Sequence, residues 1–343
     1  MRTIPRLVCV GLLLLGFVGV TWAQSEDLFE FKKVTEGVYA AIAKPLSMRT
    51  LNCNAAVIIN EDDVIVVDTH SKPSAARALI RGIARITKKP VRYVVNSHFH
   101  WDHMQGNEAY PSAFPRGVEI VASTQTRNNI QKLGIPRVKD QMQALPGAIE
   151  KLKADLQAAN DPAPKKALAA ELAQAEAYLK ELKTMQLVLP TVTFDKSLVI
   201  HRKERDIYLL YLGRGHTDGD VVVYIPKDKV VATGDLLHGW MPYMGDSFPR
   251  EWVETLKEVE KLDFTKIIGG HGEVGDRGRA VTFRSYLADL IRTVEQEARA
   301  GKSLEDVKKS VPDKLAPQHE GQMPGFRTSI NANIDKVYSE VRK

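Results

Sequence analysis

Cysteine is scarce in this 343-residue sequence, with Cys9 and Cys53 as its two thiols. So few thiols cannot build a disulfide framework, and the fold must rest on an ordinary core, for which 44% apolar residues suffice. Cys53 lies beside a predicted strand, where a buried small hydrophobe is favoured over a thiol ligand or nucleophile.

Strong charge of one sign is also missing, since the net charge is +6 and acidic and basic residues are interspersed along the chain. This pattern favours solubility and argues only weakly for an anionic partner. No nucleic-acid partner is expected, and the expected partner is a small-molecule substrate. The sequence has no Gly-x-Ser-x-Gly segment, so a serine nucleophile on a sharp turn is not indicated. It has no repeat of 20–50 residues either, which excludes a solenoid or propeller.

Long hydrophobic runs are confined to the N-terminus, where Leu7 to Val20 follow Arg2 and Arg6. The run is shorter than the roughly 20 residues of a membrane span, and small residues at Thr21 and Ala23 suit a cleavage site. We therefore predict a signal peptide over residues 1–23 and export to the periplasm or outside the cell, a retained anchor being the alternative. Its removal takes two arginines away, leaves +4, and leaves no stable membrane span.

Against these absences stands one segment rich in metal-binding side chains, which follows the apolar, β-branched run 91–95. His98 and His100 are two residues apart and can converge on one ion from an extended backbone. Asp102 and His103 are adjacent, so we expect their side chains to point apart and to reach a second ion. Imidazole and carboxylate groups suit zinc and neighbouring first-row metals.

Three more such residues follow predicted strands, with glycine close by on the chain: His216, Asp235 and His271. Glycine allows unusual backbone angles and close approach to an ion. Asp68 ends another predicted strand, where it could orient a ligand or serve as a simple turn residue. His70 and His238 follow strand ends as well, and they could contact substrate or be structural. Aromatic residues that could line a substrate pocket are Trp101, Trp240 and Tyr243.

Short β-rich runs alternate with amphipathic helical stretches along the chain. The expected strands cover 27–42 (a pair), 55–59, 64–67, 91–95, 118–122, 191–194, 197–201, 207–212, 221–225, 229–233 and 264–268. The expected helices cover 73–87, 124–133, 281–300, a short stretch after 303, and 326–341. An Ala-, Lys- and Glu-rich segment at about 140–186, broken at 160–164, predicts a helical hairpin. It could be a lid, a dimer contact or, as the simplest reading, surface decoration.

The ordered set Asp68, His98-x-His100-x-Asp102-His103, His216, Asp235 and His271 resembles the five motifs of the metallo-β-lactamase superfamily. The resemblance covers about residues 54–273. It implies an α+β, αββα sandwich of two mixed β-sheets flanked by helices, with the hairpin inserted into a single domain of residues 24–343.

The resemblance also implies the roles of the metal ligands. His98, His100 and His216 would hold a first ion, and Asp235 would bridge it to a second one. The second ion would be held by Asp102, His103 and His271. Two zinc ions are expected, with iron or manganese as alternatives. Metal binding lowers the pKa of water from 15.7 to about 7, so a metal-held hydroxide could attack a carbonyl carbon. Asp102 is the candidate catalytic residue, orienting that hydroxide or moving its proton.

The predicted function is therefore hydrolysis of an ester, thioester, lactone or β-lactam bond. β-Lactamases with the same histidine motif generally lack a bridging aspartate, whereas Asp235 resembles glyoxalase II and the lactonases. A β-lactamase proper or a glyoxalase II-like thioesterase is the alternative. A phosphodiesterase and a mononuclear-iron persulfide dioxygenase are less favoured, as is a binding role with purely structural metals. The sequence indicates no oligomeric state.

Overall fold

The computed structural model describes residues 28–44 and 51–341 of the protein. The expected signal segment and Cys9 lie outside the described residues. Within the described part, the strands form one sheet of seven and one of five. The first sheet contains β1 (Phe29–Thr35), β2 (Val38–Ala43), β3 (Ala55–Ile59), β4 (Val64–Val67), β5 (Val91–Val95), β6 (Glu119–Ser123) and β7 (Val192–Phe194). The second contains β8 (Ser197–His201), β9 (Asp206–Leu210), β10 (Val222–Ile225), β11 (Val230–Gly234) and β12 (Lys266–Gly269).

Both sheets are mixed, as the sequence predicts. In the first sheet, β1 to β4 pair antiparallel, and β4 to β7 pair parallel. In the second, β8 to β11 pair antiparallel and β12 adds in parallel to β11. Parallel neighbours end at the same edge of a sheet, so side chains that follow β4, β5, β11 and β12 can gather in one place.

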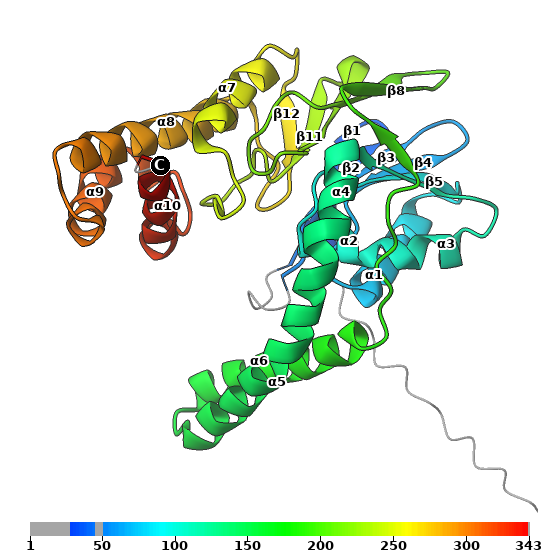
Figure 1. The fold of residues 1–343 in the computed structure, drawn as a ribbon. Coiled ribbons are helices and arrows are strands. Elements are labelled where there is room, and N and C mark those ends of the chain that lie inside the picture. The colour runs from blue at the N-terminus through cyan, green and yellow to red at the C-terminus, as the bar shows by residue number, and fades with distance from the viewer. Residues whose placement is uncertain (1–27, 45–50, 342–343) are drawn as a thin grey trace, which may run out of the picture.

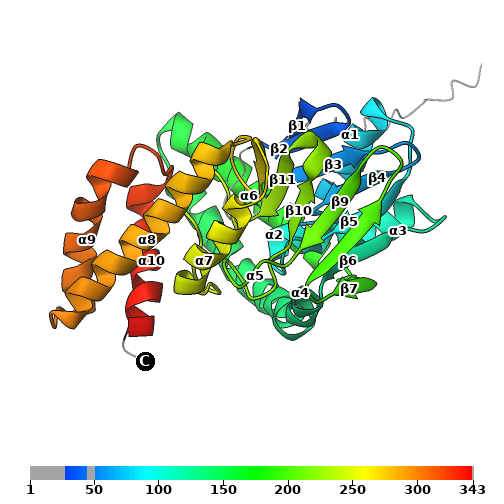
Figure 2. The same ribbon diagram turned by 90° about the horizontal axis from the view of Figure 1, so that it is seen from above.

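Alternation along the strands sorts the core into layers, because successive side chains point to opposite faces of a sheet. Val221 and Val223 pack in the apolar cluster between the two sheets, whereas Val222 packs outward with α7 (Pro249–Glu260) and α8 (Arg277–Arg299). On the far side, α1 (Pro73–Ile86) covers the outer face of the first sheet. Figure 2 shows the sheets face to face between these helices. The expected αββα sandwich is thereby confirmed.

The predicted helical hairpin consists of α5 (Ile135–Ala158) and α6 (Pro162–Leu182), which project from the sandwich in Figure 1. Leu145, Ile149 and Leu152 of α5 pack in one cluster with Ala175 and Tyr178 of α6. The hairpin starts earlier than the sequence suggests, because α4 (Thr124–Asn129) continues through a π-helical turn into α5.

The C-terminal third holds more helix than its sequence pattern indicated. The helix α7 was not predicted, although Pro249 at its first turn is a typical start signal. The stretch after Ser303 forms a full helix, α9 (Leu304–His319), which packs with α8 and α10 (Phe326–Val341). Two short helices, α2 (Trp101–Met104) and α3 (Ala109–Ala113), lie near the histidine motif. Among the described residues, no helix is both long and apolar enough to cross a bilayer.

Glu297 on α8 joins the C-terminal helices through hydrogen bonds from Lys302, Ser310 and Lys314. Burial alone would raise the pKa of Glu297, but these partners lower it to about 2. Because this value lies below the ordinary 4.5, the carboxylate stabilises the fold above pH 4.5, and the stabilisation is lost as the pH falls toward 2.

We therefore expect Glu297→Gln to lower the Tm at pH 7 by roughly 2–5 °C, since a charged acceptor is lost. Thermal melts followed by circular dichroism from pH 7 to pH 2.5 check this. The difference from the wild type should shrink as the pH drops, and a constant difference would contradict the assignment.

Candidate metal centre

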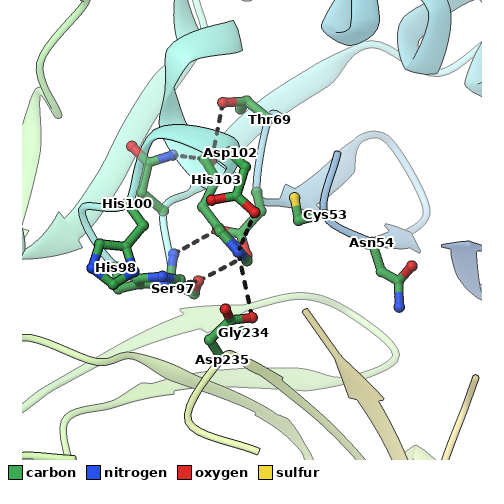
Figure 3. A network of polar contacts seen from close by, with 12 residues as sticks. Cys53, Asn54, Thr69, Ser97, His98, His100, Asp102, His103, Gly234 and Asp235 are labelled. Carbon is green, nitrogen blue, oxygen red and sulfur yellow. Dashed lines mark hydrogen bonds and ion pairs between the residues drawn. The ribbon is translucent and has the colours of Figure 1, made fainter. Parts of the chain in front are cut away.

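The seven predicted ligands meet at one edge of the sandwich, and all of them are buried. His98, His100, Asp102 and His103 follow β5 of the first sheet, while Asp235 and His271 follow β11 and β12 of the second. His216 lies in the loop between β9 and β10. Figure 3 shows the histidines of the first segment facing Asp235 across the gap between the sheets.

The first group of ligands consists of His98, His100 and His216, whose candidate ligand atoms lie within 4.8 Å of one another. Nδ1 of His100 lies 2.8 Å from Nε2 of His216. The extended backbone at His100 (φ −65°, ψ 146°) lets both histidines of the His-x-His pair face the same point. The structure therefore brings together the three residues expected at the first ion.

The second group consists of Asp102, His103 and His271, also within 4.8 Å of one another. Oδ2 of Asp102 lies 3.5 Å from Nε2 of His103 and 3.2 Å from Nε2 of His271. The expectation that Asp102 and His103 point apart is thus wrong. The chain enters α2 at Trp101, and neighbouring helical side chains are separated by about 100° rather than the 180° of a strand, so both reach the same point.

Asp235 lies between the two groups. Its Oδ2 is 3.7 Å from Nε2 of His216 and 3.4 Å from Nε2 of His271, and its Oδ1 is 3.4 Å from Nε2 of His103. One carboxylate therefore faces ligand atoms of both groups.

Two glycines make this approach possible. Gly234 has a φ of +50°, and a Cβ atom there would lie 2.2 Å from Oγ of Ser97. A Cβ atom on Gly270 would lie 2.1 Å from Oδ1 of Asp235 and 2.8 Å from Cε1 of His103. Any larger residue at either position would push the two sheets' ligand loops apart.

Hydrogen bonds behind three of the histidines, His98, His100 and His103, fix which of their ring nitrogens faces the centre. Asp68 accepts from the Ser97 N–H and O–H (both 2.7 Å) and from Nδ1 of His103 (2.8 Å). Since the Ser97 hydroxyl donates its one proton to Asp68, it must accept from Nδ1–H of His98, 3.0 Å away. The Nε2 atom of His98 is then free of its proton, which is the form that binds metals, and Nε2 is the nitrogen of His103 that is left to face the centre.

In His100 the two ring nitrogens have exchanged roles, and Nε2 rather than Nδ1 is held from behind. Its Nε2 lies 2.8 Å from Oδ2 of Asp246, so Nδ1 is the nitrogen left without a proton toward His216. Arg137 of α5 donates two hydrogen bonds, of 2.8 and 2.7 Å, to the same carboxylate. Burial alone would raise the pKa of Asp246, but the bonds from Arg137 and His100 hold it well below its usual range.

The donor set fits divalent metal ions. Nε2 of His98, Nε2 of His103 and Oδ1 of Asp235 are buried and have no hydrogen-bond partner among the described residues. Buried polar atoms without partners are rare in proteins, and here they point at one another. Burial keeps the pKa of His98 and His216 well below the usual value, so both are neutral. Burial also acts on Asp235, but neighbouring His271 and His103 keep its pKa low, so it is ionised.

The loop that carries His216 is braced by its own residues. The Thr217 N–H and hydroxyl donate to the buried carboxylate of Asp220, at 2.9 and 2.6 Å. Burial raises the pKa of Asp220 to about 7, although the bonds from Thr217 oppose the shift. The Thr217 carbonyl accepts from Gly215, which closes the turn around His216.

A cavity of about 470 Å³ opens at the centre, and both carboxylates Asp102 and Asp235 reach it. The three aromatic residues proposed from the sequence, Trp101, Trp240 and Tyr243, all line this cavity. Its other lining residues include Leu51, Arg137, His238 and Met241. Tyr243 is 58% exposed, so an aromatic face is available at the mouth. The wall is apolar and the floor is polar, as in most small-molecule sites.

The sequence left the roles of several further residues undecided, and the structure places some of them at the pocket and others in the core. Asp68 has the ligand-orienting contacts that were one of its two interpretations. His238 lines the cavity, and burial lowers its pKa to about 4. His70 is fully buried against the Phe29 ring, 4.2 Å between centroids, with Nδ1 3.4 Å from Sγ of Cys53. Cys53 is a buried residue, as expected, and burial raises the pKa of its thiol to about 12.

Sequence reasoning missed Asp246 and Arg137. Asp246 lies in an irregular loop, and Arg137 resembles any other charge on a helix of the insertion. The two residues are 109 positions apart in the chain, so no local spacing connects them.

The sequence profile of the metallo-β-lactamase superfamily matches residues 48–271, which span the ligand set from His98 to His271. The chain belongs to this superfamily. The expected family and fold are thus confirmed, and divalent metal binding by histidine and aspartate clusters is the property that the family implies.

The relatives within the superfamily are named for different reactions. The metallo-β-lactamase type 2 of Bacillus cereus is 31% identical over 118 residues, which is 33% of this chain and 43% of that protein. A linear primary-alkylsulfatase from a Pseudomonas strain is 24% identical over 294 residues, 81% of this chain and 53% of that protein. The chain thus spans about half, or less, of the curated relatives it matches. Both relatives are hydrolases by name, in line with the expected enzyme class.

Solved structures resemble the fold. A metallo-β-lactamase from Pontibacter korlensis superposes with a TM-score of 0.55 at 17% identity, covering 76% of this chain and 99% of that one. About a quarter of the present chain therefore has no counterpart in that structure.

Proposed function

We propose that this superfamily member is a dinuclear metal-dependent hydrolase of a small-molecule substrate. In this proposal His98, His100 and His216 hold the first ion. Asp102, His103 and His271 hold the second, and Asp235 bridges the pair. Zinc is the expected metal, with iron or manganese as alternatives. When bound, the ions would supply Lewis-acid activation of water and of the bond to be cleaved.

The position of Asp235 is the observation that carries this proposal. Its carboxylate oxygens lie 3.4–3.7 Å from ring nitrogens of both groups. A site for a single ion would leave one of the groups without a purpose. Ionised carboxylates buried at this centre are also costly to keep in a fold unless cations balance them.

Within the proposed centre, Asp102 is the residue suited to hold a proton. Its Oδ2 lies 3.2 Å from Nε2 of His271, and Asp102 also lines the cavity, so it reaches both the ligands and the substrate space. His103 and His271 lower its pKa against the effect of burial, which keeps it ionised and able to accept a proton. The aromatic wall of Trp101 and Trp240 would exclude water around an apolar part of the substrate.

The bond to be cleaved is proposed to be an ester, thioester, lactone or β-lactam. A sulfate ester is a second candidate, because the alignment with the alkylsulfatase extends over 81% of this chain, whereas the β-lactamase alignment covers 33%. We also propose that the protein is exported, on the strength of the signal-like residues 1–23.

An assay of the zinc-loaded protein against a panel of substrates tests the proposal. The panel contains a β-lactam, a lactone, an acyl thioester, a carboxylic ester and a long-chain alkyl sulfate, and each is run with a chelated aliquot beside it. We expect one class to be hydrolysed, with the rate falling at least about 100-fold after chelation and returning on addition of zinc. Protein that carries two ions per chain and cleaves none of these classes would contradict the proposed function.

A further inference from the structure

We propose that Arg137 is a positioning residue for the first metal ion: through Asp246 it sets the orientation of His100, so the inserted helical hairpin is part of the metal centre. This inference rests on the proposed function for its metal ions. It assigns a role to the insertion, for which surface decoration was the simplest interpretation.

The chain of contacts runs from α5 to the ligand without a gap. Arg137 donates two hydrogen bonds to Asp246, and Oδ2 of Asp246 lies 2.8 Å from Nε2 of His100. The guanidinium also lies over the Phe99 ring, 5.2 Å from its centroid, so it contacts the residue next to the ligand. A planar, bidentate pair holds a carboxylate more rigidly than a single bond does, and the carboxylate in turn fixes the imidazole.

Among residues 28–44 and 51–341, Asp246 is the one carboxylate that holds the His100 ring from behind. His98 and His103 are both held from behind by the Asp68 network, which belongs to the sandwich itself. Asp246 instead lies on the irregular loop between β11 and α7, where the regular backbone pairing of a sheet does not fix its position. Its side chain is fixed by Arg137, and Arg137 belongs to the insertion. One ligand of the first ion therefore depends on the hairpin, whereas its neighbours do not.

A second set of contacts docks the hairpin beside the same segment. The Tyr178 hydroxyl of α6 lies 2.8 Å from Oε1 of Gln105, just after His103 in the chain, and 3.2 Å from Oε1 of Gln141 on α5. The Trp101 ring packs in the apolar cluster of the hairpin, 6.0 Å from Tyr178. Both helices of the hairpin thus contact the metal-binding segment or the residues next to it.

The experiment compares full-length Arg137→Met with Arg202→Met as a matched control. Arg202 also makes a bidentate pair, with Asp63, and also lies over an aromatic ring, Tyr93, at 5.3 Å. Its carboxylate partner precedes β4, at the end of that strand away from the metal ligands. Asp246→Asn and Arg137→Lys complete the set, the lysine keeping the charge without the planar pair.

Metal affinity is measured by competition with a chromogenic chelator, and the environment of the first site by the visible spectrum of the Co2+-loaded protein. In Arg137→Met and Asp246→Asn we expect the affinity for the first ion to fall about 10–100-fold, with an altered Co2+ spectrum. Arg137→Lys should lie between these variants and the wild type. Arg202→Met should keep wild-type affinity for both ions.

Wild-type metal affinity and an unchanged Co2+ spectrum in both Arg137→Met and Asp246→Asn would overturn the inference. If Arg137→Met does not fold, the Asp246→Asn and Arg137→Lys variants decide the question. These readouts need no substrate. A wild-type protein that binds two ions and hydrolyses nothing would refute the proposed function alone, and one that binds no metal would refute both.

Discussion

Replacing Asp235 with alanine is expected to empty the metal centre and to abolish turnover. Its carboxylate faces ligand atoms of both groups, so in the proposed centre its loss would remove a ligand from each ion at once. Metal-dependent activation contributes several kcal/mol of transition-state stabilisation, and a tenfold change in rate corresponds to about 1.4 kcal/mol. We therefore expect kcat/KM to fall by roughly 1,000-fold or more, with fewer than one ion retained per chain, measured by metal analysis and by steady-state kinetics.

Asp228→Asn provides the control for this experiment. The side chain of Asp228 is also largely shielded from solvent, with 8% exposed, and it is paired with Arg205 at 3.0 Å, but Asp228 precedes β11 while Asp235 follows the same strand. The control should lose stability without losing metal. Full metal occupancy and unchanged turnover in Asp235→Ala would count decisively against a bridging role.

Asp68→Ala should produce the largest combined loss of stability and metal affinity outside the ligand set. Three buried donors lose their acceptor: the Ser97 N–H, the Ser97 hydroxyl and Nδ1 of His103. Leaving buried donors unpaired costs about 1–3 kcal/mol for each. Asp68 also has a φ of +67°, which aspartate tolerates better than alanine does. We expect the Tm to fall by roughly 5–10 °C and the metal affinity by about 10–100-fold.

Asp68→Asn distinguishes the effect of losing the negative charge from the effect of the left-handed backbone conformation at this position. Asparagine tolerates the left-handed conformation and keeps one acceptor oxygen, so the Tm should fall by less than half as much. The metal affinity should still drop, because the neutral amide no longer draws the proton of His103 onto Nδ1. Equal effects of the alanine and asparagine variants on the Tm would show that the hydrogen-bonded charge, rather than the backbone, dominates at this position.

Much of the centre could be predicted from the sequence because its ligands obey a local rule. Each follows an apolar run closely, and parallel strands bring such positions to one edge. The order of the motifs supplied the pairing of the ligands, which periodicity alone does not contain. Asp102 and His103 were misjudged because the extended geometry of the His-x-His pair was continued two residues too far, into α2.

The supports of the centre could not be predicted in the same way. The contact between Arg137 and Asp246 joins an insertion to a loop, and neither residue has neighbours that indicate a metal site. Helix α7 was missed although its start carries a proline signal, since its apolar residues sit between many charges. Such features depend on how distant segments meet, and a single sequence records them weakly.

The division of the ligands between the two sheets has a consequence for how the protein folds. His98 to His103 come from the first sheet, whereas Asp235 and His271 come from the second, so neither half of the chain holds a complete set. An ion bound by both halves favours the docked state over every partly assembled one, by an amount that grows with its free concentration. Removal of metal is therefore expected to weaken the packing of the two sheets against each other.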